Sequence, residues 1–340
     1  MADRALARLD GAASTLPNPD LFLFMYVRRE ALLSSQIEGT QASMLDVLEF
    51  EAELGQAERE VSAAEVFNYI EALNHGLRRL RSLPVCLRLV REIHARLMKG
   101  ARGGEPRKSP GEYRRTQNWI GGSTPTNARF VPPPPGEMAQ ALHMWERYLH
   151  DRGSLPDLVQ IALLHAQFET IHPFLDGNGR AGRLLIPFLL AERGILHRPL
   201  LYLSIFFKRH RSAYYDRLQA IRDRGEWEAW LEFFMDGVAE VATEATETAR
   251  KILALRERDR QRLSALGRRS GRAHELLDFL FRQPVVNIRL VQTRLSLSQP
   301  AASTLVSEMA RIGILKEETG FRRNRRFSYR SYLKFFREID

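Results

Sequence analysis

The chain has 340 residues, 44% of them hydrophobic, which is enough for two or three domains with sizeable cores. It begins with the charged stretch MADRALARLD, which lacks the apolar segment of a signal peptide, and no apolar run approaches the length of a transmembrane helix. The single cysteine, Cys86, excludes an internal disulfide and a cysteine-cluster metal site. We therefore expect a cytoplasmic protein that does not cross a membrane.

The net charge of +10 is concentrated in the last quarter of the chain. Residues 251–340 carry 20 Lys and Arg but only 9 Asp and Glu, a net charge of +11, so the rest of the chain is close to neutral. This asymmetry predicts a C-terminal module with a partner of its own.

Helical patterns dominate the first hundred residues. An Asn-Pro-Asp start signal at 18–20 opens a helix that is expected to end at Gly39, which suits a C-cap. Ser43 and Asp46 resemble a capping box at the start of the next helix. Further stretches repeat apolar residues at three- and four-residue spacing, which predicts amphipathic helices.

A long stretch at 103–136 is rich in Gly and Pro. A loop of this length inside a compact region is usually functional or disordered. Its aromatic and branched residues, among them Trp119, Ile120, Phe130 and Val131, favour an ordered flap or a short hairpin. A mobile surface loop is the alternative interpretation.

Two helices joined by a short loop follow this stretch. The first helix is predicted over 157–171, because Pro173 disfavours helical geometry at the residue before it. The loop contains two glycines, Gly177 and Gly179, and an aspartate, and RLLIPFLLAERG then predicts the second helix. Further helices are predicted over 212–225 and 226–263.

The second helix of this pair has two arginines in an unfavourable place. Arg180 and Arg183 lie on one face in or near the first turn, where the helix dipole is positive and N–H groups lack partners. The N–H groups of Gly177, Asn178 and Gly179 form a nest for anionic oxygens, which glycine allows to come close to the backbone. Since two arginines can grip phosphates with bidentate contacts, this loop predicts a polyphosphate site.

Two side chains complete the predicted site. Asp176 would repel a bare phosphate, but it suits a ligand of Mg²⁺ carried by a nucleotide. His172 titrates near neutral pH and lies one short loop away from the nest, so it is a candidate base. Alternatively, His165, Glu169 and His172 share a helical face and could bind a metal, which would leave the nest and both arginines unexplained. GNGRAG also matches the dinucleotide-binding fingerprint formally, but no strand precedes it, so we reject that interpretation.

Residues 172–183, HPFLDGNGRAGR, resemble the signature of Fic-domain proteins, His-Pro-Phe-x-Asp/Glu-Gly-Asn-Gly-Arg-x-x-Arg, at every specified position. The resemblance extends to QNWIGG and FVPPPP upstream and to a Tyr-Tyr pair at 214–215 downstream. It implies a mainly α-helical Fic core with a short β-hairpin flap. It also implies an adenylyltransferase that moves AMP from ATP to a hydroxyl group of a protein.

The resemblance assigns a role to each residue of the motif. His172 is the base that deprotonates a Ser, Thr or Tyr of the target, and Asp176 orients Mg²⁺ on the phosphates of ATP. The implied nucleotide-binding residues are Asp176, Gly177, Asn178, Gly179, Arg180, Ala181, Gly182 and Arg183, with Tyr214 and Tyr215 on the adenine side. Asn178 is expected near the α-phosphate, and the two arginines on the outer phosphates. The implied target-binding flap contains Ile120, Gly121, Gly122, Phe130 and Val131.

Other functions stay open within this resemblance. Some relatives transfer phosphate or phosphocholine, and others remove AMP. The phosphotransferring relatives depart from the Gly-Asn-Gly pattern, which Gly179 retains here, so AMP transfer is favoured. A different class of function is a DNA-binding regulator whose Fic fold only senses nucleotide. The intact His172 favours the enzyme, because a sensor needs no base.

Ser34 and Glu38 form a second motif near the end of the first long helix. Glu38 lies at the negative pole of that helix, where a carboxylate is unfavourable without a cation. Ser34-x-x-x-Glu38-Gly39 resembles the inhibitory motif of the family, Ser/Thr-x-x-x-Glu-Gly/Asn. The resemblance implies that Glu38 pairs with Arg183 and misplaces the γ-phosphate of ATP. An ordinary exposed helix end is the alternative.

The C-terminal module is expected to contain three short helices, followed by strand-like runs in GILKEET and RRFSYR. Ser298 is expected to cap the third helix, with Pro300 in its first turn. The order resembles a winged helix-turn-helix, a fold that often binds DNA. Four arginines crowd the expected wing: Arg322, Arg323, Arg325 and Arg326. The third helix is poor in Arg and Lys, so protein interaction or dimerisation competes with DNA binding.

These interpretations divide the chain into four parts. They are an N-terminal helical region with the inhibitory motif (1–85), a Fic catalytic core (86–250), a helical linker (251–270) and a winged helix-turn-helix module (271–340). The expected partners are ATP with Mg²⁺, a protein substrate, the protein itself as a substrate, DNA at the C-terminal module and a second copy of the chain.

Overall fold

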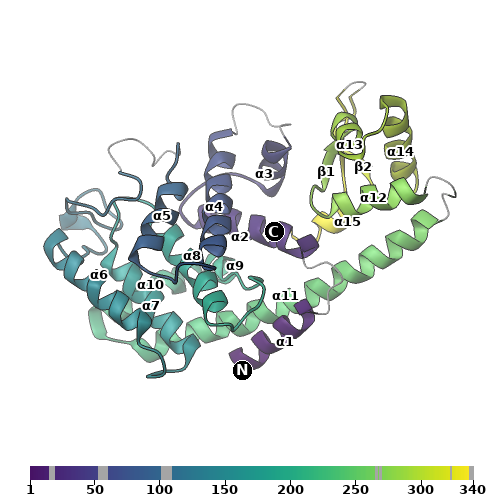
Figure 1. Cartoon of the computed structure of the whole chain (residues 1–340). Helices are drawn as coiled ribbons and strands as arrows, with labels where there is room; N and C mark the ends of the chain where they lie inside the picture. Colours follow the sequence, from purple (N-terminus) through teal and green to yellow (C-terminus); the bar gives the residue numbers. More distant parts are fainter. Residues whose placement is uncertain are drawn as a thin grey trace. The chain divides into compact units, whose positions relative to one another are not determined.

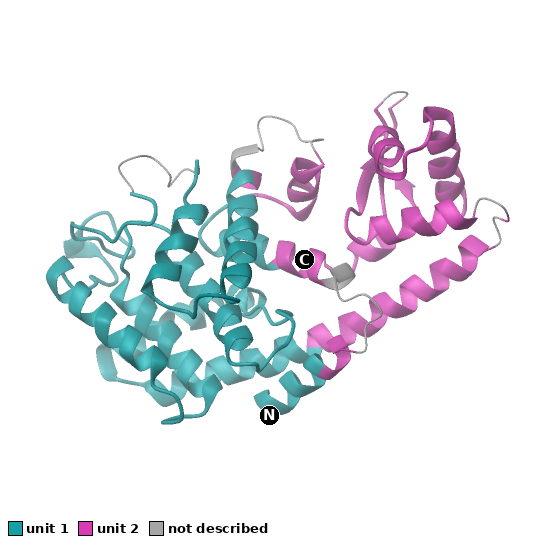
Figure 2. Cartoon of the chain, in the orientation of Figure 1, with its two compact units in different colours: residues 1–10, 30–41, 64–243 teal, residues 11–29, 42–63, 244–340 magenta. Residues whose placement is uncertain are grey.

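The computed structural model of the protein describes residues 1–14, 20–52, 60–100, 109–264, 267, 270–321 and 324–336 (Figure 1). The fold is mainly helical, with a small antiparallel sheet near the C-terminus. The chain forms two compact units, which are described separately (Figure 2). The first contains residues 1–10, 30–41 and 64–243, and the second contains residues 11–29, 42–63 and 244–340.

The first unit is built from helices. Those that lie wholly or mostly in it are α4 (Glu60–Arg79), α5 (Leu87–Leu97), α6 (Pro135–His150), α7 (Asp157–Ile171), α8 (Asn178–Glu192), α9 (Ser204–Arg209) and α10 (Arg211–Arg224). A 3₁₀ turn, η3, spans Pro125–Asn127. Helix α4 begins in the second unit, and three more helices are shared between the units: α1 (Ala2–Ser14), α2 (Asp20–Ile37) and α11 (Trp227–Ser264). Within the residues described, no helix combines the length and the apolar character needed to cross a bilayer.

Helices α7 and α8 form the centre of the first unit. They pack against each other, with α5 on α8 and with α6 and α10 on α7. Almost every side chain of α8 is buried, as expected of a helix that is apolar on all sides. Trp145 of α6 and Trp230 of α11 donate their indole N–H groups to carbonyl oxygens of α7, at 3.0 and 2.9 Å. The short loop between α7 and α8 is therefore held at both ends by the core.

Several predicted helix ends are confirmed. Ser43 and Asp46 form a capping box, in which the Ser43 hydroxyl accepts from the Asp46 N–H and the Ser43 N–H donates to the Asp46 carboxylate. Helix α7 ends at Ile171, as Pro173 predicts. Helix α2 ends at Ile37, just before the predicted stop. Residues 18 and 19 of the start signal lie outside the described residues.

The second unit contains the sheet. Its strands β1 (Val285–Asn287), β2 (Lys316–Glu317) and β3 (Arg326–Ser328) are antiparallel and in the order β1-β3-β2. Ser328 of β3 pairs with Val285 on one side and with Lys316 on the other. The remaining helices of this unit are α3 (Met44–Glu51), α12 (Ser270–Leu280), α13 (Ile288–Leu295), α14 (Gln299–Arg311) and α15 (Arg330–Leu333).

The three short helices and the two C-terminal strands of this unit are confirmed, and Ser298 caps α14 with Pro300 in its first turn. The sequence pattern predicts no strand before Asn287, and the structure corrects this with β1. Three residues are too few to show an alternating pattern, and the hydrogen bonds of β1 come from β3, far along the chain. Arg322 and Arg323 of the expected wing lie outside the described residues.

Gly76 tests the packing of α4 against α8. A Cβ atom at this position would overlap with the ring of Phe188, so Gly76→Ala is expected to destabilise the protein by about 1–3 kcal/mol through overpacking. Gly136→Ala on α6 is the control, because a Cβ there meets no atom within 4 Å. Alanine favours the interior of α4 over glycine by about 1 kcal/mol, so the overlap with Phe188 must cost more than this gain to lower the Tm. Thermal unfolding should show a lower Tm for Gly76→Ala alone; equal Tm values would contradict the close α4–α8 contact.

Candidate active site

The loop between α7 and α8 (residues 172–177) is shaped by two residues in the left-handed region. His172 ends α7 with φ 49°, and Gly177 begins α8 with φ 76°. The N–H groups in the first turn of a helix have no acceptor within the helix, so those of Asn178 and Gly179 point to the space before α8. The N–H group of Gly177 instead donates to its neighbour, the Asp176 carboxylate, at 2.6 Å. One of the three N–H groups of the predicted nest is thus engaged within the loop.

The side chain of Asn178 holds the loop in shape. Its oxygen accepts from the N–H group of Phe174 at 2.8 Å, and its nitrogen donates to the Phe174 carbonyl at 2.8 Å. Asn118 donates to the same carbonyl at 2.9 Å. Asn178 is only 2% exposed. Its backbone N–H group, rather than its side chain, is therefore the part that can meet an anion.

His94 of α5 supports the loop through hydrogen bonds and ring stacking. The sequence pattern does not predict this role. Its Nδ1 accepts from the Gly111 N–H group at 2.9 Å, and its Nε2 lies 2.9 Å from the Asp176 carbonyl. The imidazole stacks on the ring of Phe174 with centroids 3.6 Å apart. Burial lowers the pKa of His94 to about 4. The ring is neutral at pH 7, as one accepting and one donating nitrogen require.

Arg114 is a second support that the sequence pattern does not reveal. Its buried guanidinium donates to the carbonyl oxygens of His172 at 3.0 Å, Ile171 at 3.4 Å and Pro133. The Arg114 N–H group donates to the Pro173 carbonyl at 2.9 Å. These bonds satisfy the last carbonyl groups of α7 and fix the direction in which the chain leaves that helix.

The imidazole of His172 is held with one nitrogen available. Its Nδ1 lies 3.3 Å from the Glu169 carbonyl, which can only accept, so Nδ1 carries the proton and Nε2 is the acceptor. Burial is the main cause that lowers the pKa of His172 to about 4, and the charges of Arg222 and Arg114 also lower it. At neutral pH the ring is therefore neutral and can take up a proton at Nε2.

Arg183 of α8 meets both residues of the predicted inhibitory motif. Its Nη2 donates to the Glu38 carboxylate at 2.7 Å and to the Ser34 carbonyl at 2.9 Å, and its Nε donates to the Ser34 hydroxyl at 2.8 Å. The Arg183 side chain is 2% exposed, against 36% for Glu38. Burial alone would raise the pKa of Glu38, but the nearby charges, first that of Arg183, lower it below the usual range. The predicted contact between Glu38 and Arg183 is confirmed.

The carboxylate of Glu38 also lies at the N-terminus of α8. A Cβ atom added to Gly179 would overlap with Glu38 Oε1, so no residue other than glycine fits at this position unless Glu38 moves. The charge of Arg180 also contributes to the lowered pKa of Glu38. Glu38 is therefore the anion that occupies the space beside the predicted nest in this structure.

Arg180 has an unused donor. Its side chain is 8% exposed, and its Nη2 lies 3.7 Å from the Asp176 carboxylate and 3.6 Å from the sulfur of Met98. Among the described residues, its buried Nε has no hydrogen-bond partner. A buried donor left without an acceptor costs about 1–3 kcal/mol. An anion that reaches Arg180 would remove this cost.

The tyrosine pair is divided by the fold. Tyr214 is buried in the core, where its hydroxyl group lies 2.9 Å from His165 Nε2, whereas Tyr215 is partly exposed. Of the two, only Tyr215 has an exposed surface that a ligand could contact. His165 Nδ1 lies 3.1 Å from the Gly182 carbonyl, so both of its nitrogens are used. Within the described ranges, no three His, Cys, Asp or Glu residues form a metal-binding group, which removes the support for the alternative with Glu169.

The flap residues lie next to the end of α7. Ile120 and Phe130 form an antiparallel bridge, with N–H to O distances of 2.9 and 3.2 Å, and the glycines at 121 and 122 both have positive φ. The Arg222 guanidinium lies 4.0 Å from the centre of the Phe130 ring and donates to the Glu169 carbonyl at 3.1 Å. Val131 is 43% exposed. The flap is therefore attached to the α7 end that carries His172.

Comparison with known proteins gives family matches over most of the first unit. The model of the Fic/DOC family N-terminal region matches residues 1–78, and the Fic/DOC family model matches residues 84–190. The protein adenylyltransferase Fic of Drosophila grimshawi is 33% identical over 159 residues, which are 46% of this chain and 29% of the relative. That of Aedes aegypti is 32% identical over 154 residues, 45% of this chain and 27% of the relative. The match thus spans less than a third of these relatives.

Solved structures show the same fold over longer spans. A Fic family protein from Desulfovibrio desulfuricans G20 superposes with a TM-score of 0.60 at 18% identity, covering 96% of this chain and 94% of the other. A Fic domain containing signaling protein from Bacteroides thetaiotaomicron VPI-5482 gives a TM-score of 0.59 at 18% identity, covering 74% of this chain and 97% of the other. Since the two family models together match more than half of the residues and the fold agrees, this chain belongs to the Fic/DOC family.

Proposed function

We propose that this protein is an adenylyltransferase that transfers AMP from ATP to a hydroxyl group of a protein, and that Glu38 restrains it. The observation that carries the proposal is the neutral His172, whose free Nε2 lies one short loop away from the N-terminus of a helix with two buried arginines. The relatives named protein adenylyltransferase Fic, about a third identical over this region, support the same reaction.

In the proposed reaction, His172 is the general base that accepts the proton of the target hydroxyl group. The hydroxyl oxygen of the target attacks the α-phosphorus of ATP while Nε2 of His172 takes the hydroxyl proton. The bond from the α-phosphorus to the oxygen that leads to the β-phosphorus breaks, and pyrophosphate leaves with that electron pair. The lowered pKa of His172 keeps the ring unprotonated before the attack, so the base is ready at neutral pH.

The charges and N–H groups at the start of α8 are suited to bind the phosphates of a nucleoside triphosphate. The N–H groups of Asn178 and Gly179 and the positive end of the helix dipole favour negative oxygens. Arg180 offers a buried donor without a partner, and Arg183 offers a buried charge. Asp176, a partly exposed carboxylate in the loop, fits the oxygen-ligand preference of Mg²⁺. Bound with ATP, Mg²⁺ would neutralise part of the phosphate charge.

Glu38 would restrain this site by occupying its anion position. The carboxylate binds the arginine that the outer phosphate needs, and it lies beside Gly179 where phosphate oxygens are expected. If ATP binds while Glu38 is in place, its outer phosphates would not reach the position that the reaction needs. The restraint is an ion pair with one partly exposed partner, so it can be exchanged for a ligand.

The remaining parts of the chain complete the proposal. The bridge between Ile120 and Phe130 is the base of a hairpin flap that would hold an extended target segment by strand addition. The order helix, strand, helix, helix, strand, strand after residue 270 supports a winged helix-turn-helix module at 271–340. We assign residues 251–270, which begin with the last part of α11 up to Ser264, to the linker. In this division, residues 1–85 carry the restraint and residues 86–250 carry the catalysis. A nucleotide sensor without transferase activity is the competing function.

His172→Ala is the test of the base. In a Glu38→Gly background, the change is expected to lower AMP transfer roughly 10²–10⁴-fold, the usual contribution of a positioned base, and to leave ATP binding intact. Transfer is measured with ATP labelled at the α-phosphate, and binding by calorimetry. His143→Ala, at an exposed position on α6, is the matched control and should transfer at the parent rate. Unchanged transfer without His172 would contradict the proposed role and favour the sensor.

Glu38→Gly is the test of the restraint. Loss of a charge-assisted contact of about 1.5–3 kcal/mol predicts a rise in AMP transfer of roughly 10- to 100-fold. Arg183→Ala should abolish this gain, because the same arginine holds the outer phosphates. Ser34→Ala removes one hydrogen bond but keeps the ion pair, so it should give a smaller rise.

Mass spectrometry for AMP adducts on the protein itself and on proteins of a lysate measures these changes. If Glu38→Gly forms no more adduct than the parent protein while His172 is still required, Glu38 is an ordinary helix-end residue. If no variant forms adducts with any protein, the transferase assignment itself is wrong.

A further inference from the structure

The second unit contains a helix pair followed by a strand pair. Helices α13 and α14 pack against each other and are joined by a short turn, in which Ser296 has φ 51°. Helix α12 packs against both of them. Strands β2 and β3 follow and are connected by a loop that contains Asn324 and Arg325. In helix-turn-helix proteins, the second helix of such a pair enters the major groove of DNA.

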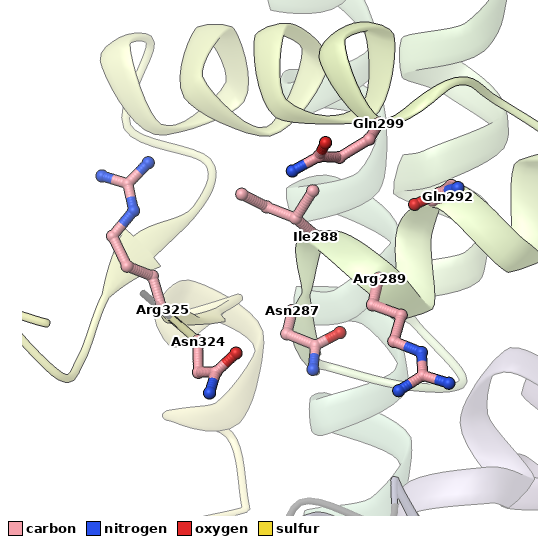
Figure 3. A pocket seen from close by; sticks show the side chains of 7 residues that line it. All are labelled: Asn287, Ile288, Arg289, Gln292, Gln299, Asn324 and Arg325. Atoms are coloured by element: carbon pink, nitrogen blue, oxygen red, sulfur yellow. The ribbon is translucent and has the colours of Figure 1, made fainter. Parts of the chain in front are cut away.

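A cleft of about 490 Å³ lies between these elements (Figure 3). Its polar lining residues are Asn287, Arg289, Gln292, Gln299, Asn324 and Arg325. The cleft lining contains no carboxylate, and Ile288 is its apolar member. Figure 3 shows Arg325 and Arg289 on opposite sides of Asn287, with Gln299 at the start of α14. Strand β1, helix α13, helix α14 and the β2–β3 loop therefore place amides and cations around one space.

The two arginines of the cleft are available for an anion. Among the described residues, neither Arg289 nor Arg325 has a carboxylate within 4 Å, whereas Arg330 and Arg272 of the same unit are paired with Glu318 and Glu275. Arg289 is exposed, and Arg325 is partly exposed. The charge of Arg325 lowers the pKa of Glu317, but no ion pair joins these two side chains, so both arginines of the cleft can still meet a phosphate.

The amide side chains of the cleft are of the kind that forms hydrogen bonds with the edges of DNA bases. Asparagine and glutamine side chains pair with adenine in the major groove through one donor and one acceptor. The oxygen of Asn287 is already used, because it accepts from the Leu290 N–H group at 2.7 Å as the cap of α13. Among the described residues, the side chains of Gln292, Gln299 and Asn324 have no such bond. Gln292 and Gln299 lie on the helix pair, so they are the amides that we assign to base edges.

The outer face of α14 favours a groove over a protein partner. Its exposed residues include Gln299, Ala301, Thr304 and Ser307, which are uncharged and mostly small, so the helix backbone can come close to a ligand. A protein interface would need large apolar or aromatic anchors at its centre. Helix α14 has a single basic residue, Arg311, in its last turn. The cations for phosphate contacts must therefore come from α13 and the β2–β3 loop.

We propose that this module binds double-stranded DNA, with α14 in the major groove, Arg289 and Arg325 on the flanking phosphates, and Gln292 and Gln299 at base edges. The binding site is separate from the residues of the proposed AMP transfer, so either can be correct without the other.

The test uses the full chain and fluorescence anisotropy with labelled duplex DNA of mixed sequence. Binding is expected at low salt and should weaken as salt rises, with a slope of log K against log salt of about −0.9 for each phosphate contacted. Arg289→Ala and Arg325→Ala should each weaken binding roughly tenfold and reduce the slope by about 1. Arg272→Ala removes the same charge from an arginine that is paired on α12, so it should bind like the parent protein.

Two further measurements separate the placement of α14 from simple charge attraction. Thr304→Glu adds a carboxylate to the exposed face of α14 and should abolish binding, while an unchanged Tm shows that the module still folds. Duplex RNA of the same sequence should bind more weakly, because its deep, narrow major groove does not admit a helix.

Absence of DNA binding at low salt would overturn the proposal. So would equal effects of Arg272→Ala and Arg325→Ala, because binding would then follow net charge rather than the cleft. Equal affinity for duplex RNA would overturn the placement of α14 in the major groove.

Discussion

The buried guanidinium of Arg183 is the constraint around which the site is built. A charge removed from water needs an opposite charge and hydrogen-bond acceptors, or its burial costs several kcal/mol. Glu38 and Ser34 supply both in this structure. In the proposed active state, phosphate oxygens would have to supply them instead. Since Arg183 needs an anion in either state, the proposed function makes the choice of anion the choice between restraint and activity.

Three carboxylates compete for the positive charge of Arg183, and burial decides among them. Glu30 is enclosed by the hydroxyl groups of Tyr69 and Ser204, at 2.8 and 2.6 Å, and burial raises its pKa. Burial also raises the pKa of Glu169, to about 7, and its Oε1 has no partner among the described residues. Only Glu38 has a lowered pKa. The partly exposed Glu38, and not the buried Glu30 or Glu169, is therefore the counter-ion of Arg183 that a ligand can replace.

The parts of the site that could be predicted from the sequence are those encoded by neighbouring residues. The loop before α8 follows from its glycines and the helix after it, and the contact between Glu38 and Arg183 was implied by the resemblance of two short motifs. His94 and Arg114 escaped prediction because they act on backbone carbonyl groups, which have no signature in the sequence. Strand β1 escaped for the same reason, since its partner is the backbone of β3. Most helices, by contrast, follow from apolar spacing and local caps.

Net charge shows the same limit at the C-terminal module. The excess of arginine in residues 251–340 indicates a partner, but six of the twelve arginines that the structure describes there form local ion pairs. The local ion pairs join Arg256 to Asp278, Arg258 and Arg262 to Asp259, Arg272 to Glu275, Arg326 to Glu49, and Arg330 to Glu318. A paired arginine contributes little field to a distant ligand, because its charge is cancelled at short range. The cleft brings together amide side chains and two arginines that have no ion pair among the described residues, and this depends on the positions of side chains in space, which composition does not contain.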